Sequence, residues 1–490
     1  MNEEGTKKQD NPSNEEVRTN KQENPSDEEV RTNKQKSSSS GRNEKNELFE
    51  TMEPGKALAL MALPTVASQM IILIYNLADT WFIGRTNNPY MIGASSLGLS
   101  IYLAEVALAN VFGTGGGSLM VRLAGEQKPE DARKVASYSL AMSAVTAFAF
   151  SLIVFLFLDP ILLLLGASEN TLTYGRQYVF MTTVIGGIPT VLSMCMPQLL
   201  RNSGYAKEAG IGVGMGSFLN VYLDPLFMFV LFPKGWEVIG AGVATMLSNV
   251  VSMIYFIIVF RKLRDKTVLS LPRRIERITP DQKQSLYMVG IPAAFAIFLF
   301  DLVAMVTNRI TVTYGDIPLA AMGIVTKLER IPVNIGLGVC LGMVPLVAYN
   351  YGSGNKDRMG KISSLSRTVV VSFSMICVAL FLIFAEKIVG SFISNEETIQ
   401  WGCRFLRGRC IALPFMMLGY QAVNYMNAIG KGKVSFLLAI IRHIVLIIPL
   451  TMIMNHMWGI NGLIWSLVVS DVLNTMIRWF ILRSNWCKNV

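Results

Sequence analysis

The sequence predicts an all-α integral membrane protein whose twelve transmembrane helices form two six-helix bundles, related by a pseudo-two-fold axis along the membrane normal. Three observations support this prediction. Of the 490 residues, 51% are hydrophobic and only 16% are charged, whereas soluble domains carry roughly 25% charged residues. Long apolar stretches recur along most of the chain. The pattern of prolines, glycines and charges also repeats itself after about 227 residues.

Twelve stretches are long and apolar enough to cross a membrane, which takes about 20 mostly apolar residues. In chain order they lie at residues 57–83, 92–121, 135–158, 174–200, 209–232, 238–260, 286–313, 318–349, 364–385, 399–427, 434–456 and 460–482. The sequence therefore predicts an N-terminal bundle over residues 54–260 and a C-terminal bundle over residues 285–483. Pro64 and Pro292 occupy equivalent positions in the two bundles, and a proline inside a helix bends it.

Each half has an even number of spans, so both halves have the same orientation in the membrane. Parallel repeats of this kind enclose a cavity near the membrane midplane. The arrangement is typical of transporters that expose such a cavity to one side of the membrane at a time.

The basic residues of the connections predict which side of the membrane is cytoplasmic. Twenty Lys and Arg residues occupy alternate connections, and only four occupy the others; the basic set lies at residues 122–134, 201–207, 261–283, 356–367 and 431–433. By the positive-inside rule both termini are cytoplasmic, in a multi-pass protein of the cell (inner or plasma) membrane. Residues 261–284 are the predicted basic linker between bundles, and residues 484–490 the cytoplasmic C-terminal end.

The first 53 residues differ from the rest in composition. They contain nine Lys and Arg, thirteen Asp and Glu, and a tandem repeat in which QDNPSNEEVRTNKQ is followed by QENPSDEEVRTNKQ. With so few apolar residues, a disordered acidic tail is predicted over residues 1–53, or alternatively a docking tail. The membrane body is therefore more basic than the net charge of +10. Its cations mark the cytoplasmic face, and no nucleic-acid partner is expected.

Charged side chains inside membrane spans are costly and indicate functional sites. Asp79 lies in the first span and Asp224 in the fifth, and Asn220 shares a helical face with Asp224 because the two are four residues apart. With the Thr245 hydroxyl they form an all-oxygen group that suits a hard cation or a proton held between two carboxylates. The alternative is that each Asp caps a helix or pairs locally.

The second half has its own intramembrane charges, which either line the cavity or neutralise one another in ion pairs. They are Asp301, Arg309, Lys327, Glu329 and Arg330. The predicted lining of a substrate cavity comprises Gln69, Tyr75, Asn76, Lys327 and Glu329.

Catalytic chemistry is not indicated by the sequence. The two His residues lack metal-ligand spacing, the six Cys residues form no CxxC pair, and no Walker-type loop is present. We therefore expect a transporter with no cofactor and no metal beyond a coupling Na⁺.

Two motifs carry a resemblance to a known family: NLADTWFIG from Asn76 and NVYLDPLF from Asn220. GEQK from Gly125 and PLVAYNYG from Pro345 add to it. With these motifs and the two six-span halves, residues 56–483 resemble the MATE (multidrug and toxic compound extrusion) exporters. The branch they resemble most is the bacterial and archaeal one whose ion site lies in the N-terminal half.

The resemblance implies an antiporter that exports organic cations and other drugs in exchange for H⁺ or Na⁺. The partners it implies are small-molecule drugs and the lipid bilayer, and a monomer is expected. In that branch the coupling residues correspond here to Asp79, Asn220 and Asp224, and the helix-six threonine corresponds to Thr245. Glu329 does not match the second-half acidic site of another branch.

Two other classes of protein stay open on the sequence. A flippase for a lipid-linked sugar would need a strongly cationic cavity; Arg309, Lys327 and Arg330 favour it, and the first-half carboxylates disfavour it. A membrane scaffold or receptor would leave the internal repeat and the buried Asp pair without a role.

Overall fold

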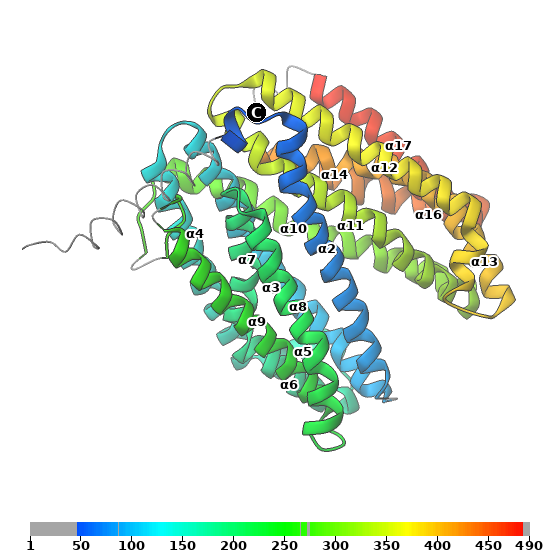
Figure 1. The fold of residues 1–490 in the computed structure, drawn as a ribbon. Coiled ribbons are helices and arrows are strands. Elements are labelled where there is room, and N and C mark those ends of the chain that lie inside the picture. Colours follow the sequence, from blue (N-terminus) through cyan, green and yellow to red (C-terminus); the bar gives the residue numbers. More distant parts are fainter. Residues whose placement is uncertain (1–46, 87, 265, 272–274, 484–490) are drawn as a thin grey trace, which may run out of the picture.

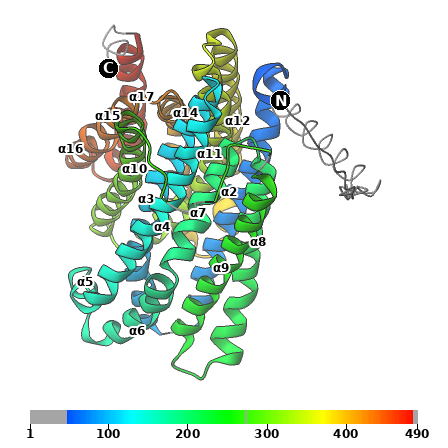
Figure 2. The ribbon, with the colours of Figure 1, turned by 90° about the vertical axis from the view of Figure 1, so that its left-hand side faces the viewer.

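The computed structural model describes residues 47–86, 88–264, 266–271 and 275–483. The predicted tail up to residue 46 and the predicted C-terminal end at 484–490 lie outside the described residues. The described chain consists of helices joined by short turns, and α2 begins at the same end of the molecule at which α17 ends (Figures 1 and 2).

The helices form two groups, which we call the N-lobe and the C-lobe. The N-lobe contains α2 (Pro54–Gly84), α3 (Pro89–Gly125), α4 (Pro129–Leu156), α5 (Leu158–Leu164), α6 (Glu169–Val179), η1 (Phe180–Ile185), α7 (Gly187–Asn202), α8 (Ala206–Leu226), η2 (Phe227–Leu231) and α9 (Glu237–Leu263). The C-lobe contains α10 (Pro280–Val312), α11 (Asp316–Gly352), α12 (Lys356–Gly390), α13 (Glu396–Arg409), η3 (Cys410–Ala412), α14 (Leu413–Ala428), α15 (Gly432–Ile440), η4 (Ile441–Ile447), α16 (Ile448–Trp458) and α17 (Ile460–Arg483).

These elements make six spans in each lobe, which confirms the predicted twelve-helix fold. Among the described residues, ten helices are long and apolar enough to cross a membrane by themselves, and α6–η1 with α7 forms an eleventh span that is bent by 54°. The twelfth is α13–η3–α14. Its first helix has five charged side chains within 14 residues, which lowers its hydropathy.

Some spans are less regular than the sequence indicated. The π-helical segments η1, η2 and η4 interrupt three of them, and the short helix α5 follows the third span. π-Helical turns widen a helix locally and are frequent at functional sites. Apolar periodicity alone predicted continuous helices at these places.

The lobes meet closely in the half of the molecule where α2 begins, because glycines let the backbones touch. A Cβ atom on Gly338 of α11 would lie 2.6 Å from the Cα of Val66 in α2, and one on Gly342 would lie 2.7 Å from the Cα of Ala62. Small residues at such spacing are the usual means of close helix packing in membranes. The α2–α11 contact therefore has no room for even one added methyl group.

Hydrogen bonds between the lobes support the same contact. Ser118 Oγ donates to the carbonyl of Asn427 (2.9 Å), and Arg122 Nη2 donates to Ser285 Oγ (3.0 Å). Ser118 and Asn427 are both buried. The lobes are thus held together by polar as well as van der Waals contacts at this end.

Toward the other end the lobes diverge, as Figure 1 shows. On α11 the exposed residues Gly323, Lys327 and Ile331 lie on the same helical face as Gly338 and Gly342, by the 3.6-residue period. The face that touches α2 at one end is therefore open to solvent at the other. We use the name interlobe cleft for the region bounded by these exposed residues of α11 and by the exposed Asn76 of α2.

One predicted boundary is wrong. The disordered tail was expected to reach residue 53, but residues 47–52 form a helical turn in which Leu48 and Phe49 are only 6% and 7% exposed. The physical reason is that these two apolar side chains are buried against the rest of the protein, which holds the turn in place. The linker is also shorter than the predicted 261–284, because α9 extends to Leu263 and α10 begins at Pro280 behind the Thr279 cap.

Candidate functional site

The face of α2 opposite the cleft points into the N-lobe and positions Asp79. Ser68, Tyr75, Asp79 and Ile83 recur at helical spacing, and Ser68 and Ile83 are 1% and 4% exposed. The α2 face is held against α8 where Gly210 lies beside Ser68. Asp79 is therefore directed at the interior of one lobe and away from the space between the lobes.

A face of α8 brings the second carboxylate to the same interior. Asn220 and Asp224 are 2% and 0% exposed, and Asn220 Nδ2 donates to Asp224 Oδ1 (3.3 Å) and to Thr245 Oγ1 of α9 (3.3 Å). α9 can approach because Gly216 lies on this face and contacts Ser252. The structure thus joins Asn220, Asp224 and Thr245 in one hydrogen-bonded group.

Asp79 lies on the α2 face that packs on α8 and points toward the same interior. Asp79 Oδ1, Asn220 Oδ1 and Asp224 Oδ2 are buried and have no hydrogen-bond partner. Buried polar atoms are nearly always paired, so three unpaired acceptors in one site need an explanation. Protons or a hard cation would satisfy them, because both bind to oxygen ligands.

Three tyrosines and a third carboxylate surround the site. Tyr75 lies on the same α2 face as Asp79, four residues away. Tyr178 lies at the end of α6, where its carbonyl would be 3.4 Å from a Cβ atom on Gly242 of α9, and Tyr102 lies on α3 three residues before Glu105. The sequence placed Tyr75 in the substrate lining, whereas the structure places it among these groups.

Glu105 of α3 is a further buried acid of the N-lobe. It is 1% exposed, its Oε1 atom has no hydrogen-bond partner, and Tyr102 lies near it. A Cβ atom on Gly187 would lie 3.3 Å from Oε1. The only sequence signal was an acidic residue inside an apolar span, for which an interhelical hydrogen bond is the favoured interpretation.

Among the described C-lobe charges are two buried ion pairs and several exposed cations. Glu329 accepts two hydrogen bonds from Arg409, from Nε (2.9 Å) and Nη2 (2.8 Å). Arg442 and Asp471 form a second buried pair, with 2.7 Å between Nε and Oδ1. The structure therefore puts Glu329 in an ion pair, one of the two alternatives that the sequence left open.

The remaining residues of the predicted lining lie at the interlobe cleft. Lys327 is exposed on the cleft face of α11, Asn76 is exposed on α2, and Gln69 is partly exposed at the edge of the α2–α11 contact. Arg330 and Arg309 are also exposed. The structure therefore separates the predicted site into a buried N-lobe group and a solvent-exposed cleft.

Both predicted helix-bending prolines lie inside long helices, Pro64 in α2 and Pro292 in α10. Ser68 Oγ donates to the Pro64 carbonyl (2.7 Å), and Gly210 of α8 lies beside the same carbonyl. Pro64 is thus within one turn of the α2–α11 contact and of the α2–α8 contact. A bend there would move the Asp79 end of α2 relative to both.

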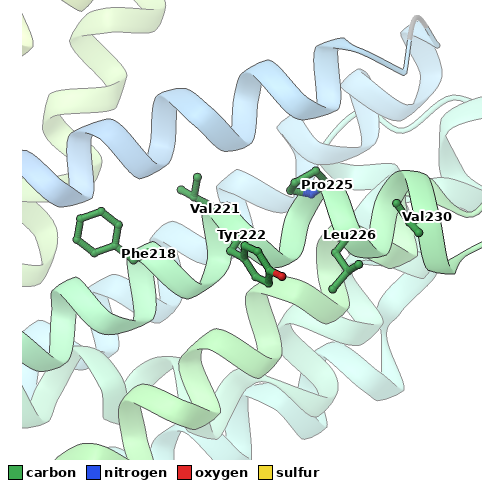
Figure 3. A pocket seen from close by; sticks show the side chains of 6 residues that line it. All are labelled: Phe218, Val221, Tyr222, Pro225, Leu226 and Val230. Atoms are coloured by element: carbon green, nitrogen blue, oxygen red, sulfur yellow. The ribbon is translucent and has the colours of Figure 1, made fainter.

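An apolar pocket of about 460 Å³ lies along α8 and η2 (Figure 3). Its lining residues are Phe218, Val221, Tyr222, Pro225, Leu226 and Val230. Asn220 and Asp224 are absent from this lining because they occupy the face of α8 that packs on α9. The pocket is therefore separate from the buried polar group.

Comparison with known proteins agrees with this architecture. The MatE family model matches the chain twice, at residues 64–226 and 292–453. The two matches begin at Pro64 and at Pro292 and correspond to the repeat recognised in the sequence. They show directly that the two lobes are copies of one unit.

A curated relative is similar in sequence, and solved structures are similar in fold, over nearly the whole chain. The multidrug export protein MepA of Staphylococcus haemolyticus (strain JCSC1435) is 30% identical over 449 residues, which cover 90% of this chain and 96% of that protein. The crystal structure of MATE in complex with MaL6 has a TM-score of 0.84 at 22% identity, over 91% of this chain and 99% of that one. The structure described as an outward-facing conformation of a multidrug resistance MATE family transporter has a TM-score of 0.81 at 22% identity and covers 89% of this chain and 97% of that one.

The family model and the named relative define a membrane transport protein, not an enzyme, and the structure gives it two six-helix lobes. The chain belongs to the MATE family. It is accordingly a multi-span protein of a cell membrane.

Proposed function

We propose that this protein exports small-molecule drugs, organic cations among them, in exchange for inward H⁺ or Na⁺, by alternating access and without a cofactor. The named relative is a multidrug export protein, which supports the class of substrate. In this proposal the transporter acts as a monomer, and the end at which α2 begins is cytoplasmic, as are both termini. The lobes contact each other at that end, so the structure corresponds to an outward-facing state.

The observation that carries the proposal is the set of three unpaired buried oxygens on Asp79, Asn220 and Asp224. An unsatisfied buried acceptor costs about 1–3 kcal/mol, and a bound H⁺ or Na⁺ would satisfy these oxygens. We infer that the group holds an exchangeable ion.

The coupling follows from the separate positions of ion site and cleft. Asp79 of α2 points into the N-lobe interior, whereas Asn76, also on α2, and Lys327 of α11 face the cleft. The helix α2 therefore contributes to both the ion site and the region proposed to bind drug. An ion can shift the drug equilibrium only if it binds the two forms of α2 with different affinity. We infer that ion binding at Asp79, Asn220 and Asp224 favours the form of α2 that releases drug outward, with Pro64 and Pro292 as the bending points of their helices.

Transport by reconstituted vesicles tests this proposal. A fluorescent organic cation should move against its gradient when an H⁺ or a Na⁺ gradient is imposed, each tested separately. Asp79→Asn and Asp224→Asn should abolish the driven accumulation. Asp281→Asn, at an exposed position in the first turn of α10, is the matched control. Driven accumulation by both buried variants at the control rate would show that the coupling assignment is wrong.

A flippase for a lipid-linked sugar is the second candidate, because exposed Lys327, Arg330 and Arg309 could hold a phosphate group. The other two intramembrane cations described above are neutralised, since Arg409 pairs with Glu329 and Arg442 with Asp471. The same vesicles loaded with a lipid-linked oligosaccharide distinguish the two functions. Lipid transfer without dye transport would replace the exporter proposal.

A further inference from the structure

Residues 47–52, which we call the strap, form one helical turn just before α2. The amides of Thr51 and Met52 donate to the carbonyl of Glu47 (3.0 and 2.7 Å). Leu48 and Phe49 are buried, while Glu47, Glu50 and Thr51 are exposed. The position of such an amphipathic turn depends on the residues against which its buried side packs.

On one side the strap meets the C-lobe, at the ends of α11 and α12. The Phe49 ring stacks on Tyr349, with centroids 4.9 Å apart and planes inclined by 22°. The Tyr349 hydroxyl also donates to the carboxylate of Glu50. Ring and hydroxyl of one C-lobe side chain thus both contact the strap.

The strap backbone is held by the C-lobe as well. The Phe49 carbonyl accepts hydrogen bonds from Asn350 Nδ2 (3.1 Å) and Arg358 Nε (2.9 Å), and the Leu48 carbonyl accepts one from Arg358 Nη2 (3.2 Å). Arg358 is only 9% exposed. A buried guanidinium needs its hydrogen-bond partners, and here two of its N–H groups are paired by the strap.

On the other side the strap meets the N-lobe. Gly204, in the turn between α7 and α8, lies against both buried side chains: a Cβ atom there would be 3.2 Å from Phe49 and 3.4 Å from Leu48. The strap also continues through Glu53 directly into α2. It therefore lies between the lobes at the end where they are in contact and binds both of them.

We propose that the strap locks the cytoplasmic ends of the two lobes together, and that it must leave Tyr349, Asn350 and Arg358 before the inward-facing state forms. This inference rests on the alternating-access part of the proposed function. Contacts made in only one of two states shift the equilibrium toward that state. The strap therefore sets how often the cytoplasmic side opens, without contacting ion or drug.

The test measures the separation of the lobes in the full-length protein by double electron–electron resonance. Spin labels are placed at Glu130→Cys in α4 and Lys361→Cys in α12, both exposed near the cytoplasmic ends of their helices. The native cysteines are replaced by serine, and the protein is held in lipid nanodiscs without drug. Phe49→Ala and Arg358→Gln each remove a strap contact. Thr51→Ala is the control, because Thr51 is exposed and its hydroxyl bonds only within the strap.

Phe49→Ala and Arg358→Gln should each raise the long-distance, cytoplasm-open population by about tenfold relative to the unsubstituted strap, as expected for removal of a buried ring or of charged hydrogen bonds. Thr51→Ala should leave the distribution unchanged. Tyr349→Phe keeps the ring and loses only the bond to Glu50, so it provides a milder variant if Phe49→Ala does not fold. Distributions identical to the control in every folded variant would overturn the proposal.

This readout needs neither a drug nor an ion gradient. A shift of the distance distribution supports the strap even if Asp79→Asn and Asp224→Asn transport normally, in which case only the coupling assignment fails. Normal ion-coupled transport together with unshifted spin-label distances would instead reject only the proposal about the strap.

Discussion

The contact between α2 and α11 predicts that a single methyl group added at Gly342 separates the lobes at the end where α2 begins, which we propose is the cytoplasmic side. A Cβ atom there would lie 2.7 Å from the Cα and 2.8 Å from the N of Ala62. Carbon atoms pack at about 3.5–4.0 Å, so the two backbones must separate by about 1 Å. Neither contacting atom belongs to a side chain that could rotate away.

The size of the effect follows from overpacking, which costs about 1–3 kcal/mol in a close-packed contact. The cost falls only on the state in which α2 and α11 touch. The equilibrium between closed and open cytoplasmic sides should therefore shift by about 5–150-fold, the factor that corresponds to this range of free energy.

The assay follows a cysteine placed at Ser118, which is fully buried between the lobes, in a background without native cysteines. A membrane-impermeant thiol reagent on the cytoplasmic side modifies it only when that side opens. Gly342→Ala should accelerate modification by the same 5–150-fold factor. Gly323→Ala is the matched control on the same helix, because nothing lies within 4 Å of its Cβ position. Equal rates for Gly342→Ala and Gly323→Ala would refute the account of the interlobe contact.

Three further predictions concern the polar groups of the two lobes. Arg442→Leu leaves Asp471 buried without its guanidinium partner and should destabilise the protein by about 3–5 kcal/mol, measured by thermal unfolding in detergent. The double variant Arg442→Leu with Asp471→Leu should recover stability. An Arg442→Leu protein as stable as the wild type would contradict the prediction. Glu329→Gln should also lower thermal stability, because it removes the charge that pairs with Arg409, but it should leave ion-driven transport intact. Loss of coupling in the folded variant would mean that Glu329 belongs to the ion site. Thr245→Val removes the hydroxyl that accepts from Asn220 and should weaken apparent ion affinity by about 2–10-fold, the worth of one hydrogen bond; an unchanged ion dependence of transport would exclude Thr245 from the site.

The fold was predictable because the membrane imposes strong rules on sequence. The length of the apolar stretches predicted the spans. The equivalent positions of Pro64 and Pro292 predicted the repeat, which the two family-model matches confirm. The breaks at η1, η2 and η4 were not predictable, because an extra residue in a helical turn leaves apolar composition unchanged. The span that includes α13 was still found from sequence despite its five charges, since its second half is apolar.

The site was partly predictable. Asp79 and Asp224 stood out because carboxylates are rare in apolar spans, and Asn220 was added because its four-residue spacing puts it on the same face as Asp224. The partners of Glu329 and Asp471 could not be found, because Arg409 and Arg442 lie on other helices. The strap was missed for a related reason: its two apolar residues follow an acidic, repetitive stretch, and only the arrangement of α11 and α12 provides their binding site.

Drug affinity measured as a function of ion concentration tests the central claim most directly. Coupling is reciprocal, so an ion that drives drug out must weaken drug binding by the same factor by which drug weakens ion binding. In the wild-type protein the drug dissociation constant should rise with H⁺ or Na⁺ concentration, and in Asp224→Asn it should be independent of both. An Asp224→Asn protein whose drug affinity still responds to the ion as the wild type does would contradict the assignment of the N-lobe group as the coupling site.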